Sequence, residues 1–448
     1  MNRHYFIIKS DKEIVDAQAS LDSNDLAESF RQFVSLEMGI AVAEPQQSND
    51  KPQYLSYAHK LGFEWEPNAD AGFVQYNYRA ALIMRLVKEY ARQLVQDIGF
   101  PIYEVHGSNM FDLSHPVVEA YAKLYGDRLF QFKSGKKDVV MSYDASYPQF
   151  NLAAQAVLSH KQLPFSHFSI SDCYRHEQSG ECMLLFRQRR FYMPDIHPYF
   201  KDVNEAFAWY PAIEKQLVKA AVAVNKQYHV LVEVSSLAHW EHYQSKISEI
   251  AANLGQDILV SIHDDNQDKY WIINVDYKII DQLKQSREIG CIQIDLHNAQ
   301  RLGIQYIDKE GKNQHPVIIH AAVPGGIERF IYMMLDNFDQ SFPLWLHPAQ
   351  IRLLPVGEDH IPFCEAIAHK YKDKARIEID DRSESVGKKV KQAHEDLIPF
   401  PIVIGNKEVA ADENILELLN ALNQIHISTE GKPFIPLQYP KWVSQQIR

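Results

Sequence analysis

Apolar residues recur with a helical period near residues 80–98 and in strand-like runs through the middle of the chain. In the first region the apolar positions lie three or four residues apart, which predicts an amphipathic helix: Ile83, Leu86, Val87, Tyr90, Leu94 and Ile98. Between residues 167 and 297, several runs rich in β-branched and aromatic residues follow one another with few helices between them. These runs predict a largely antiparallel sheet flanked by helices, as in an α+β domain.

The pattern changes toward both ends of the chain. Residues 5–10 predict a strand, residues 25–40 predict a helix, and the polar stretch 43–53 has the composition of a linker. After residue 351, strands and helices alternate, which predicts a small α/β domain with a parallel or mixed sheet. We therefore expect three segments: an N-terminal extension and linker over 1–54, an α+β domain over 55–343 and an α/β domain over 344–448.

Composition narrows the class of protein. The chain has 448 residues, a hydrophobic content of 46% and a net charge of −12, which is typical of a soluble globular protein. It has no apolar run of membrane-spanning length and no signal peptide, and its four cysteines lack CxxC spacing, so we expect a cytoplasmic protein without a disulfide framework. The negative charge argues against non-specific coating of nucleic acid, but basic clusters at 187–191 and 387–392 leave local binding open.

Two constellations carry candidate chemistry. In the first, Arg175 and Glu177 precede a loop, and Arg187 and Phe191 follow it, so an antiparallel hairpin would bring both arginines together. Guanidinium groups hold phosphate oxygens bidentately, and an aromatic ring can stack on a purine. The same residues also suit an exposed, charged hairpin with no ligand.

The second constellation follows the strand predicted near residue 318. Gly325 and Gly326 lead into a predicted helix that carries Arg329 in its first turn. Glycines allow close approach of the backbone to a ligand, and an arginine at this place can reach a triphosphate. This motif is weak evidence when it stands alone.

Together, in this order, the two constellations resemble motifs 2 and 3 of class II aminoacyl-tRNA synthetases. The segments YRHEQSGE, RQRRFYMPDIH, IQIDLH and HAAVPGGIERF resemble threonyl-tRNA synthetases of the archaeal type, and the similarity extends over residues 55–448. The resemblance implies a class II catalytic domain followed by an anticodon-binding domain. It also implies a homodimeric ligase of protein synthesis that activates threonine with ATP and Mg²⁺ and transfers it to tRNA through a threonyl-adenylate.

The resemblance assigns a role to each matching residue. Arg175 would hold the α-phosphate, Lys278 would neutralise charge, and Asp195 would accept a hydrogen bond from the threonine hydroxyl. The remaining matches would bind ATP at its adenine ring or its phosphates: Glu177, Arg187, Phe191, Gln293 and Arg329.

The sequence departs from the family at a metal site. The family holds a zinc ion with one cysteine and two histidines. His197 and His320 match the histidines, but Ser146 stands at the place of the cysteine, and a neutral hydroxyl is a poor zinc ligand. An alternative role for Ser146 is a capping box with Gln149 at the start of a helix. The three residues are therefore expected to contact the amino acid, and whether they hold zinc stays open.

Other departures concern the family's remaining parts. A proline at the dimer interface is replaced near Ser108, and too little chain precedes the catalytic region for the family's editing domain. The anticodon domain looks trimmed after residue 409; Arg382 and Glu408 remain as candidate base contacts, and three lysines as phosphate contacts: Lys388, Lys389 and Lys391.

These departures keep two alternatives open. One is a synthetase paralogue that adenylates threonine or another amino acid for a non-tRNA acceptor. The other is a non-catalytic paralogue with a regulatory or resistance role. The complete set of phosphate-binding arginines argues against the second, and the C-terminal domain argues against the first.

Overall fold

The computed structural model describes residues 3–23, 25–40, 52–263 and 269–441. Contacts divide the chain into two compact units. The larger unit comprises Met1–Pro52, Pro67–Phe73 and Ala91–Asn337, and the smaller comprises Gln53–Glu66, Val74–Tyr90 and Phe338–Arg448. Most of the predicted linker at 43–53 lies outside the described residues.

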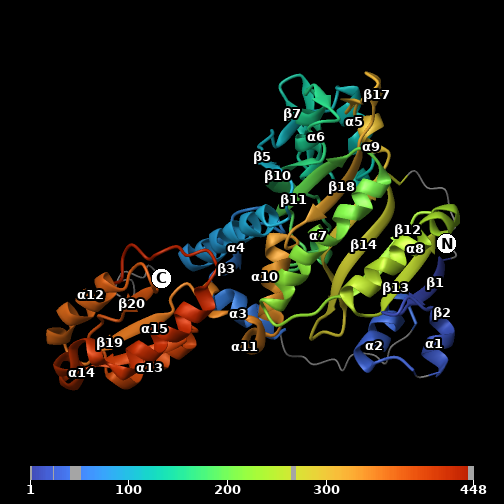
Figure 1. The fold of residues 1–448 in the computed structure, drawn as a ribbon. Helices are drawn as coiled ribbons and strands as arrows, with labels where there is room; N and C mark the ends of the chain where they lie inside the picture. The colour runs from blue at the N-terminus through green and yellow to red at the C-terminus, as the bar shows by residue number, and fades with distance from the viewer. Residues whose placement is uncertain (1–2, 24, 41–51, 264–268, 442–448) are drawn as a thin grey trace. The chain divides into compact units, whose positions relative to one another are not determined.

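The larger unit is built on a ten-stranded sheet with the order β2-β1-β13-β12-β14-β15-β18-β11-β10-β5 (Figure 1). Neighbouring strands are antiparallel except for two pairs, β12 with β13 and β10 with β5. The predicted antiparallel-rich sheet is therefore confirmed. Its strands are β1 (Arg3–Ile8), β2 (Ile14–Asp16), β5 (Ile102–Glu104), β10 (Phe165–Tyr174), β11 (Arg190–Phe200), β12 (His229–Val234), β13 (Ile258–His263), β14 (Trp271–Ile280), β15 (Ser286–Asp295) and β18 (Val317–Ala322).

The N-terminal residues form part of this sheet. Strand β1 pairs with β13 and with β2, so residues 3–16, which the sequence assigned to an extension, supply its outermost strands. Helices α1 (Ala17–Ser23) and α2 (Glu28–Glu37) follow, and Phe30 and Phe33 of α2 pack in one buried cluster with Leu231 and Leu259. The adjacent Ile7 and Ile8 of β1 are thus buried, one on each face of a sheet that only the later strands complete.

Two long helices pack on the sheet. Helix α7 (Val203–Val222) contacts β11, β15 and β18, and helix α8 (Leu237–Leu254) contacts β12 and β13 (Figure 1). Side-chain caps begin both helices: Asp202 accepts from the amide of Glu205, and Ser236 accepts from the amide of His239. Gly255 ends α8 in the left-handed conformation, at a φ of 64°.

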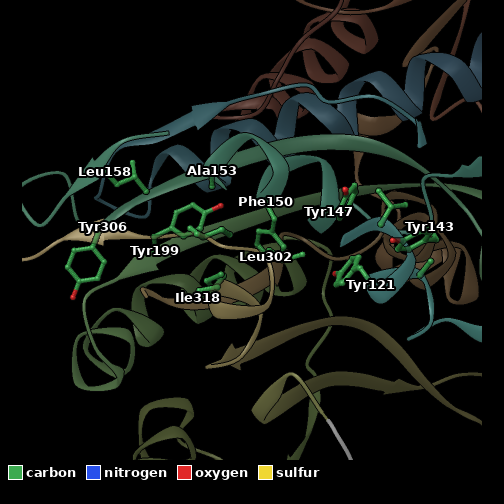
Figure 2. Close-up of a cluster of buried hydrophobic side chains, with 14 of the residues drawn as sticks. Tyr121, Tyr143, Tyr147, Phe150, Ala153, Leu158, Tyr199, Leu302, Tyr306 and Ile318 are labelled. Carbon is green, nitrogen blue, oxygen red and sulfur yellow. The ribbon is translucent and has the colours of Figure 1, made fainter. Parts of the chain in front are cut away.

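A second core supports one end of the sheet. Helix α6 (Ser146–Ala154) contacts β10 and β11, and its Tyr147, Phe150 and Ala153 pack in a cluster with Tyr199 and Ile318 (Figure 2). Because this cluster is apolar and buried, it fixes α6 against the sheet. Smaller elements complete this part of the unit: α5 (Pro116–Ala122), β6 (Met110–Asp112), β7 (Gln131–Ser134), β8 (Lys137–Met141), β9 (Leu158–Ser159), α9 (Asn298–Arg301), β16 (Tyr306–Ile307) and β17 (Asn313–Gln314). Helix α10 (Ile327–Asp336) contacts β11 and β15.

The smaller unit contains a three-stranded parallel sheet in the order β20-β19-β21. Its strands are β19 (Ile351–Pro355), β20 (Ile377–Ile379) and β21 (Phe400–Ile404), and its main helices are α12 (Ile361–Lys370), α13 (Val386–Glu395), α14 (Asn406–Ala411) and α15 (Leu416–Thr429). Strands and helices alternate as predicted, which confirms the small α/β fold. The unit also includes α3 (Gln53–Lys60), β3 (Phe63–Trp65), β4 (Val74–Tyr76), the first part of α4 (Tyr78–Gln96) and α11 (Phe338–Ser341).

Helix α4 is the amphipathic helix predicted over 80–98. All six apolar positions of the predicted face are buried, with no more than 4% of each side chain exposed. The helical period therefore identified the buried face correctly, although the helix ends at Gln96, two residues before the last of these positions.

Candidate functional site: a phosphate pocket beside a serine–histidine cluster

A cavity of about 240 Å³ lies in the larger unit, lined by residues of α6, β10, β11, β15, β18 and α10 and of the segments around them. All six residues expected to bind ATP line it: Arg175, Glu177, Arg187, Phe191, Gln293 and Arg329. Three residues expected to bind the amino acid also line it: Ser146, Asp195 and His320. The fold therefore brings together two motifs that lie about 140 residues apart in the sequence, because β11 and β18 are neighbours in the sheet.

Arg175 is held at the wall of this cavity. Its Nε donates to the backbone carbonyl of Tyr143 at 3.1 Å, and its guanidinium lies over the ring of Phe191, 5.1 Å from the centroid. These contacts leave the two terminal nitrogens for a ligand anion and fix their direction. A fixed guanidinium stabilises charge on a phosphate without reorganising first.

Glu177 and Arg187 face each other across the loop between β10 and β11. Arg187 Nη1 lies 3.8 Å from Glu177 Oε2, and this oxygen makes no hydrogen bond with any described residue although Glu177 is only 5% exposed. A buried carboxylate oxygen without a donor is costly, so it marks a place where a ligand N–H group fits.

Arg329 is positioned by strand β15 and by an aromatic ring. Its Nη1 donates to the Glu288 carboxylate at 3.1 Å and to the Glu288 carbonyl at 3.2 Å, and its guanidinium lies 4.9 Å from the centroid of the Phe186 ring. The register of β14 and β15 shifts between Tyr277 and Lys278, so the intervening residue of β15, Ile289, forms a bulge beside Glu288. The Ile289 carbonyl accepts a hydrogen bond from the amide of Gly326 at 3.3 Å, which joins the bulge to the start of α10.

A serine–histidine cluster, which we define as Ser146, His197 and His320, lies at one side of the cavity. Ser146 Oγ is 3.0 Å from His197 Nε2 and 3.3 Å from His320 Nδ1. The Phe150 ring packs edge-on against both imidazoles, with centroid distances of 4.8 and 5.3 Å. The structure thus joins three residues that are separated by up to 174 positions in the sequence.

Each imidazole has a polar partner on its far side. His197 Nδ1 lies 2.9 Å from Gln149 Oε1, and His320 Nε2 lies 2.8 Å from Asp295 Oδ2. Burial lowers the pKa of His197 well below the usual range of an imidazole, and burial also raises the pKa of Asp195, a neighbour in the cavity, to about 7. The cluster is therefore a buried environment in which unpaired charge is disfavoured.

The predicted capping box at Ser146 and Gln149 is wrong. Helix α6 begins at Ser146 without a cap from that side chain, and Asp144 Oδ1 instead accepts from the amides of Ser146 and Tyr147, both at 3.1 Å. Gln149 Nε2 donates to Ser169 Oγ at 2.8 Å and to the Asp195 carbonyl at 3.0 Å. Because Asp144 satisfies the helix amides, the hydroxyl of Ser146 is free to face the imidazoles.

The donor set of this cluster does not fit a resident zinc ion. Catalytic zinc sites are built from three protein ligands drawn from thiolates, imidazoles and carboxylates. Here two imidazole nitrogens converge on a neutral hydroxyl, and within the described ranges no group of three or more histidine, cysteine, aspartate or glutamate side chains is arranged to hold a metal.

Lys278 is not among the residues that line the cavity. Its Nζ donates to both carboxylate oxygens of Glu37, each at 2.8 Å, where α2 packs near the sheet. The ammonium is mostly buried in this pair. Lys278 therefore stabilises the attachment of α2 in this structure, and it does not meet the other expected catalytic residues.

Several residues in or beside the cavity were not assigned to the site from the sequence. Tyr270 is half-buried beside His320, with ring centroids 5.2 Å apart, and its hydroxyl donates to Gln293 Oε1 at 2.7 Å. Glu288, Gln149 and Asp295 position Arg329, His197 and His320. The local sequence does not mark Glu288, which follows the polar residues Ser286 and Arg287, whereas Gln149 and Asp295 fit helix-capping positions equally well.

The expected anticodon residues lie in the smaller unit. Arg382 donates to both oxygens of the Asp380 carboxylate, at 2.8 and 2.7 Å, and lines a cavity of about 260 Å³. Glu408 accepts from the amide of Gly405 at 2.9 Å and so caps α14. Lys389 is buried and donates to the Pro355 carbonyl at 2.9 Å, whereas Lys388 is largely exposed.

Comparison with known proteins gives matches in both units of the chain. Residues 130–338 match the model of the tRNA synthetase class II core domain (G, H, P, S and T), and residues 350–430 match the model of the anticodon binding domain. The threonine–tRNA ligase of Nanoarchaeum equitans is 38% identical over 86% of this chain and 64% of its own length. That of Pyrobaculum calidifontis is 36% identical over 88% of this chain and 68% of its own length.

A solved structure shares the fold. The RNA binding domain of threonyl-tRNA synthetase from Cryptosporidium parvum superimposes with a TM-score of 0.72 at 17% identity, covering 84% of this chain and 98% of that chain. The chain spans about two thirds of the length of the two threonine–tRNA ligases that it matches. None of the helices in the described part of the chain is long and apolar enough to cross a membrane.

Proposed function

The chain belongs to the threonine–tRNA ligase family of class II synthetases, and we propose that it activates threonine with ATP and transfers the threonyl group to tRNA. One observation carries the proposal. Three guanidinium groups, from the β10–β11 hairpin and from α10, line one cavity together with Glu177, Phe191 and the amino-acid residues. A reaction at the α-phosphate of a nucleotide needs positive charge and positioning, and these residues supply both.

In the first step, a carboxylate oxygen of threonine attacks the α-phosphorus of ATP. A bond forms between this oxygen and phosphorus, the bond from phosphorus to the bridging oxygen breaks, and pyrophosphate leaves with its electrons. Arg175 holds the α-phosphate, whereas Arg187 and Arg329 hold the outer phosphates. Phe191 stacks on adenine and the unpaired oxygen of Glu177 accepts from its amino group. Arg175 and Arg329 are each held by backbone carbonyls, so their charges are fixed before the reaction.

In the second step, a hydroxyl of the terminal ribose of tRNA attacks the threonyl carbonyl. The ester bond forms, the proton of the attacking hydroxyl passes to an oxygen of the departing AMP phosphate, and AMP leaves with the oxygen that joined phosphorus to the carbonyl. Asp195 accepts from the threonine hydroxyl in both steps, which gives the pocket a hydrogen bond that valine cannot make.

Magnesium enters this proposal as the partner of ATP. Glu288 is the lining carboxylate beside Arg329, and 40% of its side chain is exposed, so its oxygens are accessible to a phosphate-bound Mg²⁺. When bound, the ion neutralises charge on the phosphates. Glu288 would hold the ion, and Arg329 holds the outer phosphates directly at the start of α10.

The smaller unit supports tRNA as the acceptor. Arg382 is proposed to contact an anticodon base from the rim of its cavity, Glu408 to fix the nearby start of α14, and Lys388 to contact phosphate. Lys389 is buried and donates to the Pro355 carbonyl, so it is not proposed to contact phosphate. We propose a homodimer that works in the cytoplasm, where tRNA is charged.

ATP–pyrophosphate exchange across all twenty amino acids, followed by charging of total tRNA, tests the proposal. We expect exchange with threonine and formation of threonyl-tRNA. Exchange without tRNA charging would favour a carrier-directed enzyme, and no exchange with any amino acid would favour a non-catalytic paralogue.

A matched pair of arginine variants tests the pocket. Arg329→Ala is expected to lower exchange by at least about a hundredfold, the usual effect of removing a charge that acts in the transition state. Arg190→Ala is the control, because Arg190 pairs with Asp172 at 2.7 Å and is not among the lining residues. Equal exchange by both variants would refute the role of Arg329.

A further inference from the structure

The serine–histidine cluster has a defined hydrogen-bond direction. Gln149 Nε2 donates to the Asp195 carbonyl, an atom that can only accept, so the amide orientation is fixed and Gln149 Oε1 faces His197 Nδ1. His197 Nδ1 must therefore carry the proton. In the neutral ring, Nε2 is then an acceptor directed at Ser146 Oγ.

The same reasoning applies to the second imidazole. Asp295 Oδ1 accepts from the amides of His297 and Asn298, at 2.8 and 2.9 Å, and Asp295 Oδ2 faces His320 Nε2. His320 Nε2 therefore donates to a carboxylate. In the neutral ring, its Nδ1 is an acceptor, also directed at Ser146 Oγ.

Ser146 has a single proton for these two acceptors. His197 has no exposed surface and is not among the residues lining the cavity. Among the described residues, Ser146 is the group within hydrogen-bond distance of its Nε2, at 3.0 Å, whereas Asp195 Oδ2 lies 3.7 Å away. The hydroxyl proton is therefore committed to His197. Ser146 Oγ and His320 Nδ1, 3.3 Å apart on two residues that line the cavity, are left as two neighbouring acceptors.

Two neighbouring acceptors suit an ammonium group, which has three N–H donors and no acceptor. They are poorly suited to resident zinc, because the hydroxyl is neutral and its oxygen occupies the point on which both imidazole nitrogens converge. Asp195, on the same wall of the cavity, remains for the hydroxyl of the substrate.

We propose that this pocket binds the amino acid without a metal ion, and that Ser146 Oγ and His320 Nδ1 accept hydrogen bonds from the α-ammonium group. Ser146 thereby takes the place of a metal ligand and becomes a residue that determines how the substrate is recognised. The identity of the ligand as an amino acid rests on the proposed function, whereas the absence of resident metal rests on the donor set alone.

Metal content tests the inference without any activity assay. The purified protein is dialysed against a buffer containing zinc and then against buffer alone, and zinc per chain is measured by mass spectrometry. We expect below about 0.1 zinc per chain for the wild type and about one for Ser146→Cys, because a thiolate completes a Cys-His-His site. Zinc near one per chain in the wild type would overturn the inference, and so would a Ser146→Cys variant without zinc.

Two controls define the site of binding. Ser142→Cys introduces a thiol at a buried serine whose hydroxyl donates to the Asp144 carbonyl at 2.9 Å, and it should gain no zinc. Combining Ser146→Cys with His320→Ala should remove the gain. If either control binds as much zinc as Ser146→Cys, the metal binds elsewhere. The assignment of a Cys-His-His site at residue 146 is then refuted. Circular dichroism confirms that each variant is folded.

Calorimetry with L-threonine and a non-hydrolysable ATP analogue tests the ligand. In the wild type, a zinc chelator should change the dissociation constant of threonine by less than about twofold, whereas it should weaken threonine binding by zinc-loaded Ser146→Cys by about tenfold or more. A chelator-sensitive wild type would refute metal-free binding.

The failure of this inference and the failure of the proposed function give different results. If the wild type is free of zinc but activates no amino acid, the proposed function fails while the metal-free assignment stands. If the wild type holds stoichiometric zinc and shows threonine-dependent exchange, the metal-free assignment fails while the proposed function stands.

Discussion

Gly325 and Gly326 are adjacent, but the structure requires glycine only at the first position. Gly325 has a φ of +118°, and a Cβ atom there would overlap the carbonyl oxygen of Ile289 and lie 3.0 Å from its carbonyl carbon. Gly326 has a φ of −53°, and the nearest atom to an added Cβ is Arg329 Cδ at 3.8 Å. Alanine substitution should therefore be severe at Gly325 and mild at Gly326.

The magnitude follows from the contacts. Placing alanine at a φ of +118° costs about 1–3 kcal/mol in backbone strain. Moving the Ile289 carbonyl away also removes its hydrogen bond from the Gly326 amide, which contributes about 1 kcal/mol. Gly325→Ala should thus lower the free energy of unfolding of the larger unit by about 2–4 kcal/mol. Because the same bulge presents Glu288 to Arg329, exchange activity should fall as well.

Gly326→Ala is the matched control and should cost at most about 1 kcal/mol, because Gly326 is the N-cap of α10 and alanine caps poorly. Gly326→Ser should stabilise by a few tenths of a kcal/mol, since serine caps better than glycine. Urea unfolding followed by tryptophan fluorescence, together with ATP–pyrophosphate exchange, measures both effects. If Gly325→Ala and Gly326→Ala destabilise the protein equally, the role assigned to the Ile289 bulge is wrong.

Three further substitutions test other parts of the structure. Burial raises the pKa of Glu214 from 4.5 to about 7, so between these values the folded chain keeps a proton that the unfolded chain releases, and stability falls as the pH rises. In urea unfolding, the free energy of unfolding of the wild type should fall by on the order of 3 kcal/mol between pH 4.5 and pH 7, and Glu214→Gln should abolish this fall. A variant with the wild-type pH dependence would contradict this. Gln149→Leu removes the acceptor that keeps the proton on His197 Nδ1, so it should raise the KM for threonine about tenfold and leave the KM for ATP unchanged. A parallel rise in both KM values would indicate a general structural effect. Arg352→Met should destabilise the smaller unit by about 3–5 kcal/mol, because it removes a buried partner of Glu378 and Asp396, and amide hydrogen exchange in β19–β21 should accelerate; unchanged protection there would refute the estimate.

The sequence alone determined the fold and identified nine of the residues that line the cavity of the larger unit. The buried face of α4, the strands of the larger sheet and the alternation in the smaller unit follow from apolar periodicity, which reports burial wherever a face is continuous. Arg175, Arg187 and Arg329 were predicted from motifs whose spacing is tied to a hairpin and to a helix start. A hairpin and a helix start are set by residues close together in the sequence, so a motif can predict them.

The partners of individual polar side chains were decided only by the tertiary structure. Gln149 looked like a helix cap and is the acceptor that fixes His197, and Lys278 looked catalytic and pairs with Glu37. The role of the Ser146 hydroxyl depends on His197 of β11 and His320 of β18, which only the fold brings within reach of it. A polar group takes whichever partner the fold brings within about 3 Å, and that choice depends on packing between segments that are distant in the sequence, which no local pattern encodes.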